Sequence, residues 1–158
     1  MDYFYDATFT EVEVSTLVDK VGKVDILILN AAQYCEDPFP NLSPSTISDF
    51  IEINAIAPYT LLKEMTNELS RSCGQVISIG SKAEEFLMVN SEIYSISKRV
   101  WLGLLKAYVP TLKAKGIYLT HCSLPRIGES FGVDIRSACD LIISNVKNKV
   151  NSHTFVTF

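Results

Sequence analysis

The chain has 158 residues, of which 47% are hydrophobic and 20% are charged, and its formal net charge is −4. This composition is typical of a globular protein with a buried core, and the length predicts one domain over residues 1–158. There is no run of Lys or Arg that could follow a nucleic-acid backbone or an anionic membrane, so we expect neither as a partner.

The first residues, MDYFYDATFT, lack the basic start and the apolar stretch of a secretory signal, and no apolar run approaches the roughly 20 residues that span a membrane. We therefore expect a cytoplasmic protein with free thiols. The cysteines at 35, 73, 122 and 139 have no C-x-x-C spacing. Cys122 follows His121 in a predicted strand, which favours packing over metal binding, and no metal site is predicted.

The chain opens with a weak strand candidate at residues 1–6, followed by a predicted helix. Thr10 and Glu13 have the spacing of a capping box that begins this helix, and Gly22 can end it. Residues 24–31, VDILILNA, are apolar for several positions without alternation. Such a run is typical of a strand that is covered on both faces in a parallel sheet.

The second helical stretch covers about residues 44–70, with Ser43 as its N-cap and Pro44 in its first turn. Pro58 has no N–H group for the carbonyl of Asn54, so we expect a kink near Asn54. Residues 74–81, GQVISIGS, then predict the next strand.

The rest of the chain predicts a helix from about Ser91 to Lys115, a strand at 116–125, a helix from about Val133 to Lys149 and a strand at 152–158. Strands that alternate with helices predict an α/β fold with a parallel sheet and right-handed crossovers. The segment 126–133, RIGESFGV, is a short loop before the last helix.

Polar and small residues follow three of the predicted strands. Ligands of an open parallel sheet bind beyond the carboxyl ends of its strands. Asn30, Ala31 and Ala32 follow the strand at 24–31, Ser81 ends the next strand, and Pro125 ends the third. These residues are the first candidates for a binding site.

Tyr94 and Lys98 lie four residues apart in YSISK and therefore share one side of a helix. A cation within hydrogen-bonding range lowers a phenol pKa from about 10 by roughly 1 to 3 units, which predicts Tyr94 as a proton donor or acceptor near neutral pH. Ser81 is predicted to hydrogen-bond a substrate oxygen while a bound cofactor exchanges the hydride.

This ordered set of Asn54, Ser81, Tyr94 and Lys98 resembles the active-site tetrad of the short-chain dehydrogenase/reductase family. The resemblance implies a Rossmann-like parallel sheet with helices on both faces and an NAD(P)-dependent enzyme that interconverts a carbonyl and a secondary alcohol. It implies that Tyr94 is the catalytic acid/base and that Lys98 holds the nicotinamide ribose and lowers the Tyr94 pKa. Ser81 would orient the carbonyl, and Asn54 would anchor a proton-relay water.

The cofactor contacts also follow from the resemblance. Asp6 in YDAT is similar to the adenine-side aspartate of the family, and ILNAA is similar to its Asn-Ala-Gly segment. The cofactor is expected to be NAD or NADP, without a choice between them. The expected binding residues are Asp6, Asn30, Ala31, Ala32, Tyr94, Lys98, Pro125 and Ile127.

Each of these residues also has an ordinary structural interpretation when it is taken alone. A Tyr and a Lys at this spacing are often a lysine stem that packs on a ring, and a Ser at a strand end often belongs to a turn. Asn54 could satisfy backbone groups at the Pro58 kink, and Asn30 could cap a turn. The order and spacing of the whole set favour the catalytic interpretation.

The sequence departs from the family at its start, because no Thr-Gly-x-x-x-Gly-x-Gly turn is present to meet a pyrophosphate. The fold is therefore predicted to be N-terminally incomplete, with the first two family strands absent and the strand at 24–31 left as an apolar edge. Three explanations remain open: a piece of a longer protein, direct pairing of residues 1–6 with 24–31, or strands supplied by a partner. Pro125 is followed by Arg126 where the family has Pro-Gly, and the short loop at 126–133 argues against a bulky, tightly enclosed substrate.

Two functions stay open from the sequence: the oxidoreductase acting on a small carbonyl or alcohol, and a catalytically silent oligomerisation or binding module. The resemblance implies a homodimer or homotetramer assembled through the helices at 44–70 and 91–115. Trp101, Leu105 and Tyr108 would then belong either to that interface or, more simply, to the core.

Overall fold

The computed structural model describes residues 11–127, 133–147 and 154–157. The strand candidate at 1–6, the capping box that begins at Thr10, and Asp6 lie outside these residues. Within the described ranges, no helix combines the length and apolar character needed to cross a bilayer.

In the part of the chain that the structure describes, four parallel strands form one sheet in the order β1-β2-β3-β4: Ile26–Leu29, Gln75–Ser81, Tyr118–Leu124 and Thr154–Thr157. The predicted parallel sheet is confirmed, although β1, β2 and β3 are each shorter than the predicted strands at 24–31, 74–81 and 116–125. The central pair is in register from Gln75 opposite Tyr118 to Ser81 opposite Leu124, which places the ends of β2 and β3 side by side.

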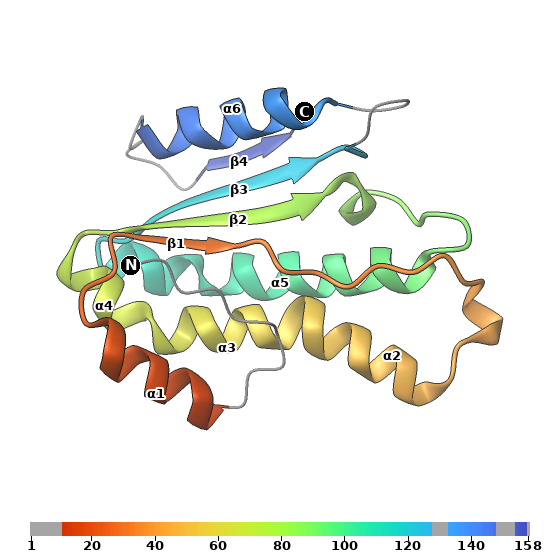
Figure 1. Cartoon of the computed structure of the whole chain (residues 1–158), viewed down its shortest axis with the longest axis horizontal. Coiled ribbons are helices and arrows are strands. Elements are labelled where there is room, and N and C mark those ends of the chain that lie inside the picture. Colours follow the sequence, from red (N-terminus) through yellow and green to blue (C-terminus); the bar gives the residue numbers. More distant parts are fainter. Residues whose placement is uncertain (1–10, 128–132, 148–153, 158) are drawn as a thin grey trace.

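Helices cover both faces of the sheet, as expected (Figure 1). On one face lie α1 (Glu11–Val21), α2 (Pro44–Ile51), α3 (Ala57–Glu64), α4 (Thr66–Arg71) and α5 (Glu92–Ala114), and α6 (Ile135–Lys147) packs on the opposite face against β2 and β3. Two short 3-10 turns, η1 (Phe39–Asn41) and η3 (Lys82–Glu84), lie in the loops. The order of strands and helices along the chain therefore agrees with the predicted α/β pattern.

The helix ends follow the local sequence signals. Ser43 Oγ accepts a hydrogen bond from the Thr46 amide at 3.1 Å, which confirms the predicted N-cap of α2. Gly116 follows α5 with a φ of +67°, and the Ile117 amide donates back to the Leu112 carbonyl at 3.0 Å. Because a left-handed residue is needed there, glycine ends α5 at little conformational cost and sends the chain directly into β3.

The predicted kink near Asn54 takes the form of a π-helical segment, η2, over Glu52–Ile56, between α2 and α3. The Ala57 amide donates to the Glu52 carbonyl, five residues earlier, and Pro58 supplies no amide for Asn54. A π-helical turn inside an α-helix holds one residue more than an α-helical turn. The wider turn places Asn54 and Ala55 on the buried side of the helix.

The main core lies between the sheet and the helices α1, α3, α4 and α5. Leu29, Val76 and Leu119 of the strands pack here against helix residues that include Trp101 and Leu105, which are 2% and 0% exposed. Tyr108 is partly buried against the same cluster. Trp101 and Leu105 are therefore core residues of this chain.

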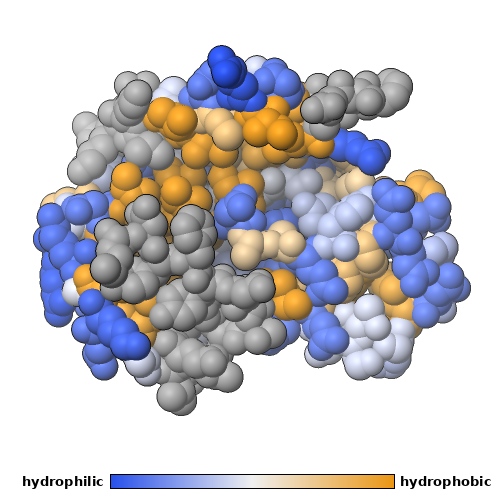
Figure 2. Space-filling view, in the orientation of Figure 1, coloured by the Kyte–Doolittle hydropathy of each residue, from blue (hydrophilic) through white to orange (hydrophobic). Residues whose placement is uncertain are grey.

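Strand β1 forms an edge of the sheet and, within the described residues, pairs only with β2. Leu27 and Leu29 face the core, whereas Ile26 and Ile28 are 44% and 55% exposed. Figure 2 shows hydrophobic surface on this face, over the strands between α1 and α6. The apolar edge that the sequence predicts at 24–31 is therefore present at Ile26 and Ile28.

Candidate active site

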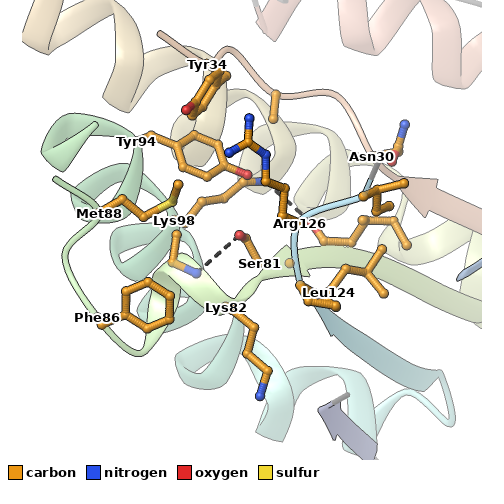
Figure 3. A pocket seen from close by; sticks show the side chains of 16 residues that line it. Asn30, Tyr34, Ser81, Lys82, Phe86, Met88, Tyr94, Lys98, Leu124 and Arg126 are labelled. Atoms are coloured by element: carbon orange, nitrogen blue, oxygen red, sulfur yellow. Dashed lines mark hydrogen bonds between the residues drawn. The ribbon is translucent and has the colours of Figure 1, made fainter. Parts of the chain in front are cut away.

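The predicted site residues meet at a cavity of about 430 Å³ beyond the carboxyl ends of the strands (Figure 3). The cavity lies between the end of β2, the start of α5, the loop after β1 and the segment after β3. Its lining residues are Asn30, Ala32, Tyr34, Ile79, Gly80, Ser81, Lys82, Ala83, Phe86, Met88, Tyr94, Lys98, Leu124, Pro125, Arg126 and Ile127.

Three of the four predicted catalytic residues, Ser81, Tyr94 and Lys98, line this one cavity. The Lys98 ammonium lies 5.8 Å from the centre of the Tyr94 ring, within the range of a cation–π contact. It also lies 3.5 Å from the Ile79 carbonyl oxygen. Two turns of α5 and the end of β2 therefore bring a phenol, an ammonium and a hydroxyl together.

Burial dominates the electrostatics of Tyr94. It raises the pKa of the phenol above 10, a hydrogen bond with the Ser81 side chain lowers it, and the nearby Glu84 and Tyr34 raise it further. The expectation that Lys98 lowers this pKa is wrong for the chain without ligand. The loss of hydration on burial outweighs the Ser81 hydrogen bond, so the phenol is held protonated.

Lys98 is only 4% exposed, and burial lowers the pKa of its ammonium while the negative charge of Glu84 raises it. A buried lysine is costly to keep charged unless it has electrostatic partners. The Lys98 ammonium has such partners in the Tyr94 ring, the Ile79 carbonyl and Glu84.

Asn54 does not line the cavity but lies behind it, 1% exposed. Its Oδ1 accepts a hydrogen bond from the Gln33 amide at 2.7 Å, and its Nδ2 donates to the Gln33 carbonyl at 2.9 Å and to Ser97 Oγ at 2.9 Å. Ser97 Oγ donates in turn to the Tyr94 carbonyl at 2.8 Å. Asn54 thus ties the loop after β1 to α5, and its side chain bonds Gln33 and Ser97 rather than the backbone of its own kink.

The other predicted contact residues divide into two groups. Asn30, Ala32, Pro125 and Ile127 line the cavity, whereas Ala31 is exposed and does not. Asp6 lies outside the described residues. The strand-end rule therefore located Asn30, Ala32, Ser81 and Pro125 of the cavity wall from the sequence.

Three residues that the sequence interpretation did not select also shape the site. Tyr34 stacks edge-on against Tyr94, with ring centres 5.2 Å apart, and lines the cavity. Glu84 and His121 form a buried pair behind Ser81, with Glu84 Oε2 and His121 Nε2 3.0 Å apart. The signal for Glu84 was in the sequence, because Ser81-Lys-Ala-Glu84 has capping-box spacing, and the structure forms that box.

His121 therefore has a carboxylate partner, and no group of three or more metal-binding side chains occurs among the described residues. All four cysteines are free, and Cys122 is fully buried, with burial raising the pKa of its thiol.

The arrangement can donate protons to a ligand oxygen. The Tyr94 phenol is held protonated, and the Ser81 hydroxyl hydrogen-bonds to it on the cavity wall. No acidic residue is among the sixteen lining residues, whereas Lys82, Lys98 and Arg126 are cationic. The cavity therefore favours a ligand with a carbonyl or hydroxyl oxygen and negative charge.

Comparison with known proteins identifies the family that this geometry fits. Residues 3–133 match the profile of the short chain dehydrogenases. The chain belongs to this family. The match includes β1 to β3, α1 to α5 and all four tetrad residues.

Two curated reductases are similar in sequence to this chain. The chain is 27% identical over 106 residues to the peroxisomal 2,4-dienoyl-CoA reductase of Saccharomyces cerevisiae, covering 66% of this chain and 34% of that protein. It is 30% identical over 107 residues to a putative ketoacyl reductase of the granaticin polyketide synthase of Streptomyces violaceoruber, covering 66% of this chain and 39% of that protein.

A solved short chain dehydrogenase from Burkholderia cenocepacia, in complex with NADP, has the same fold. Its TM-score to this chain is 0.84 at 15% identity, covering 94% of this chain and 65% of that one. The matched part thus spans about a third to two fifths of the curated relatives and about two thirds of the solved structure.

Proposed function

We propose that the chain carries the catalytic part of an NAD- or NADP-dependent oxidoreductase that interconverts a carbonyl and a secondary alcohol. The observation that supports this most directly is the convergence of Ser81, Tyr94 and Lys98 on one cavity. Family membership and the NADP complex of the Burkholderia structure are consistent with it.

In this proposal, Tyr94 transfers the proton and Ser81 orients the substrate oxygen. The phenol, held protonated by burial, donates to the carbonyl oxygen during reduction and accepts the proton back during oxidation. Ser81 donates its hydroxyl hydrogen to the same oxygen and fixes the carbonyl beside the phenol. A nicotinamide, when bound, supplies or accepts the hydride.

Lys98 and the residues after β1 and β3 are proposed to hold the ribose and nicotinamide end of the cofactor. Asn30, Ala32, Pro125 and Ile127 of these segments line the cavity. The described glycines add no contact for the phosphates of the cofactor. Gly22 and Gly116, with φ of +68° and +67°, end helices, and no described glycine belongs to a phosphate-binding turn.

The substrate is proposed to carry an apolar portion. Phe86, Met88, Leu124 and Ile127 line the cavity, and Phe86 is 53% exposed at its rim. Lys82 and Arg126 also line the cavity and favour a negatively charged end of the ligand. Acyl ketones are therefore better candidates than sugars for a substrate panel.

A nucleotide titration followed by turnover tests the proposal. Wild-type chain is titrated with NADH and NADPH by fluorescence, and the same titration is run on Tyr94→Phe and on Tyr108→Phe. Tyr108 hydroxyl lies outside the cavity, 3.1 Å from Thr66 Oγ1, so its removal is a matched control. We expect Tyr94→Phe to keep nucleotide binding and to lose turnover by at least about 100-fold, with Tyr108→Phe close to wild type. Equal turnover in the two variants would contradict the role of Tyr94.

A second candidate function, a binding or oligomerisation module without turnover, is supported by the β1 edge. Ile28 is 55% exposed there, and apolar edge strands invite pairing with another chain. This candidate predicts no binding of either nucleotide and an assembly larger than one chain by light scattering. Nucleotide binding by a single chain would exclude it.

A further inference from the structure

Glu84 and His121 form a buried hydrogen-bonded pair behind the cavity wall that the proposed proton transfer does not use. Their side chains are each only 2% exposed, and Glu84 Oε2 lies 3.0 Å from His121 Nε2. The other carboxylate oxygen, Oε1, accepts a hydrogen bond from the Ser81 amide at 3.2 Å. One carboxylate thus joins β3 to the backbone of the residue proposed to orient the substrate.

The hydrogen bonds of this pair fix its donors and acceptors. Trp101 Nε1 donates to Ser78 Oγ at 3.0 Å, and Ser78 Oγ lies 3.0 Å from His121 Nδ1. An indole N–H can only donate, so Ser78 is free to donate its own hydrogen to Nδ1. His121 then carries its hydrogen on Nε2 and donates it to Glu84. The chain runs from Trp101 through Ser78 and His121 to Glu84, which also accepts from Ser81.

The fold makes room for this pair. Ser78 and His121 are direct partners in the register of β2 and β3, which places their side chains on one face. Gly80 lies two residues further along β2, and an ideal Cβ there would overlap both Glu84 Oε1 and His121 Nε2. Only a residue without a side chain at position 80 therefore leaves space for the carboxylate and the imidazole.

The carboxylate also acts on the groups that face the cavity. Its negative charge raises the pKa of Tyr94 and the pKa of Lys98, so it favours the protonated form of both. Five titratable or charged groups surround the phenol, with His121 of β3 behind one of them. They are Tyr34 from the loop after β1, Lys98 from α5, Lys82 and Glu84 from η3, and Arg126 after β3. Of these, Glu84 is the buried carboxylate.

We propose that Glu84 and His121 are positioning residues. His121 acts as a clamp, because its hydrogen bond fixes the Glu84 carboxylate in place. The fixed carboxylate holds the Ser81 backbone amide and keeps a negative charge near Tyr94 and Lys98. The role in orienting substrate rests on the proposed function, whereas the clamp and the charge are properties of the chain by itself. The protonated form of Tyr94 is the one that can donate to a ligand oxygen.

The charge is tested without any turnover, by following the titration of Tyr94 with ¹³C-labelled tyrosine and NMR. The Tyr94 signal is assigned with Tyr94→Phe. In Glu84→Gln, which keeps an oxygen for the Ser81 amide but removes the charge, we expect Tyr94 to titrate at lower pH than in wild type. Glu85→Gln is the matched control, because it removes the same charge from the neighbouring residue, whose side chain is 54% exposed. A Tyr94 titration that is the same in Glu84→Gln and Glu85→Gln would overturn the proposal.

The clamp is tested by hydrogen exchange of the Ser81 amide, with His121→Gln as a second variant that keeps the carboxylate and serves if Glu84→Gln does not fold. We expect faster exchange of this amide in His121→Gln than in wild type, with the amides of Leu104 and Leu105 in α5 unchanged. Unchanged Ser81 exchange would overturn the clamp.

Turnover then separates this inference from the proposed function. Where the wild type reduces a ketone, we expect Glu84→Gln to lower kcat by about 10- to 100-fold without a change in nucleotide Kd, because a small misplacement of an orienting group has effects of that size. Unchanged kcat would overturn the positioning role. Absence of turnover in the wild type would refute the proposed function, and the two NMR measurements would still decide the clamp and the charge.

Discussion

Replacement of Gly80 by alanine is the most direct test of how the site is built. Gly80 lies in the extended backbone of β2, which any residue can adopt, so backbone strain does not contribute. The added Cβ would overlap Glu84 Oε1, His121 Nε2 and His121 Cε1. Both side chains are 2% exposed, so either one would have to shift within the interior to make room.

The expected loss follows from these contacts. Overpacking a buried site costs about 1 to 3 kcal/mol, and loss of a hydrogen bond to a charged group adds about 1.5 to 3 kcal/mol. We therefore expect Gly80→Ala to lower the free energy of unfolding by about 3 kcal/mol. For a chain of this size, that loss corresponds to a fall of about 6 to 12 °C in Tm.

The assay is thermal and urea unfolding followed by circular dichroism, with Gly103→Ala as the matched control. Gly103 is exposed in α5, and a Cβ there would meet nothing within 4 Å. The same substitution should raise the free energy of unfolding at position 103 by about 0.5 to 1 kcal/mol, because alanine favours a helix over glycine. A Gly80→Ala variant as stable as wild type would refute the close packing of Glu84 and His121 against the strand.

Two further predictions concern the surface and the thiols. Ile28 is 55% exposed on β1, and its replacement by lysine should leave Tm within a few degrees of wild type. The same variant should self-associate less in light scattering, because a charged edge strand resists pairing with another chain. Unchanged self-association would exclude the β1 edge as its cause. Cys73 and Cys139 are exposed and should react with a thiol reagent in the native state at pH 8, whereas Cys122, with its pKa raised by burial, should react only after unfolding. Fast labelling of Cys122, followed by mass spectrometry, would contradict its burial.

The sequence predicted the elements well because each has a local signal. Strong apolar runs mark the four strands, and the Ser43 cap and the glycines at 22 and 116 mark helix ends. Strand lengths were overestimated, since an apolar run continues beyond the last ladder hydrogen bond. The strand at 24–31 is confirmed only at Ile26–Leu29, where β2 pairs with it.

The candidate site was predicted in part. Residues at strand ends and on one side of a helix can be located by counting along the chain, which found Ser81, Tyr94 and Lys98. The contact of Glu84 with His121 joins positions 37 apart and depends on the register of β2 and β3, which no local pattern specifies. The same limit explains the wrong direction for the Tyr94 pKa. Burial of the phenol depends on Tyr34 and on the loops around the cavity, whereas the sequence showed only the nearby lysine.

The π-helical segment at Glu52–Ile56 makes the length of this helix as important as its composition. Each residue of an α-helix turns the chain by about 100°, so loss of one residue here would rotate everything before it by that amount relative to α3. Phe50, 1% exposed, would swing out of the interior, and the bond from Asn54 to the loop after β1 would break. Homologous sequences that keep this architecture should therefore vary in residue type along this stretch but show no single-residue insertions or deletions.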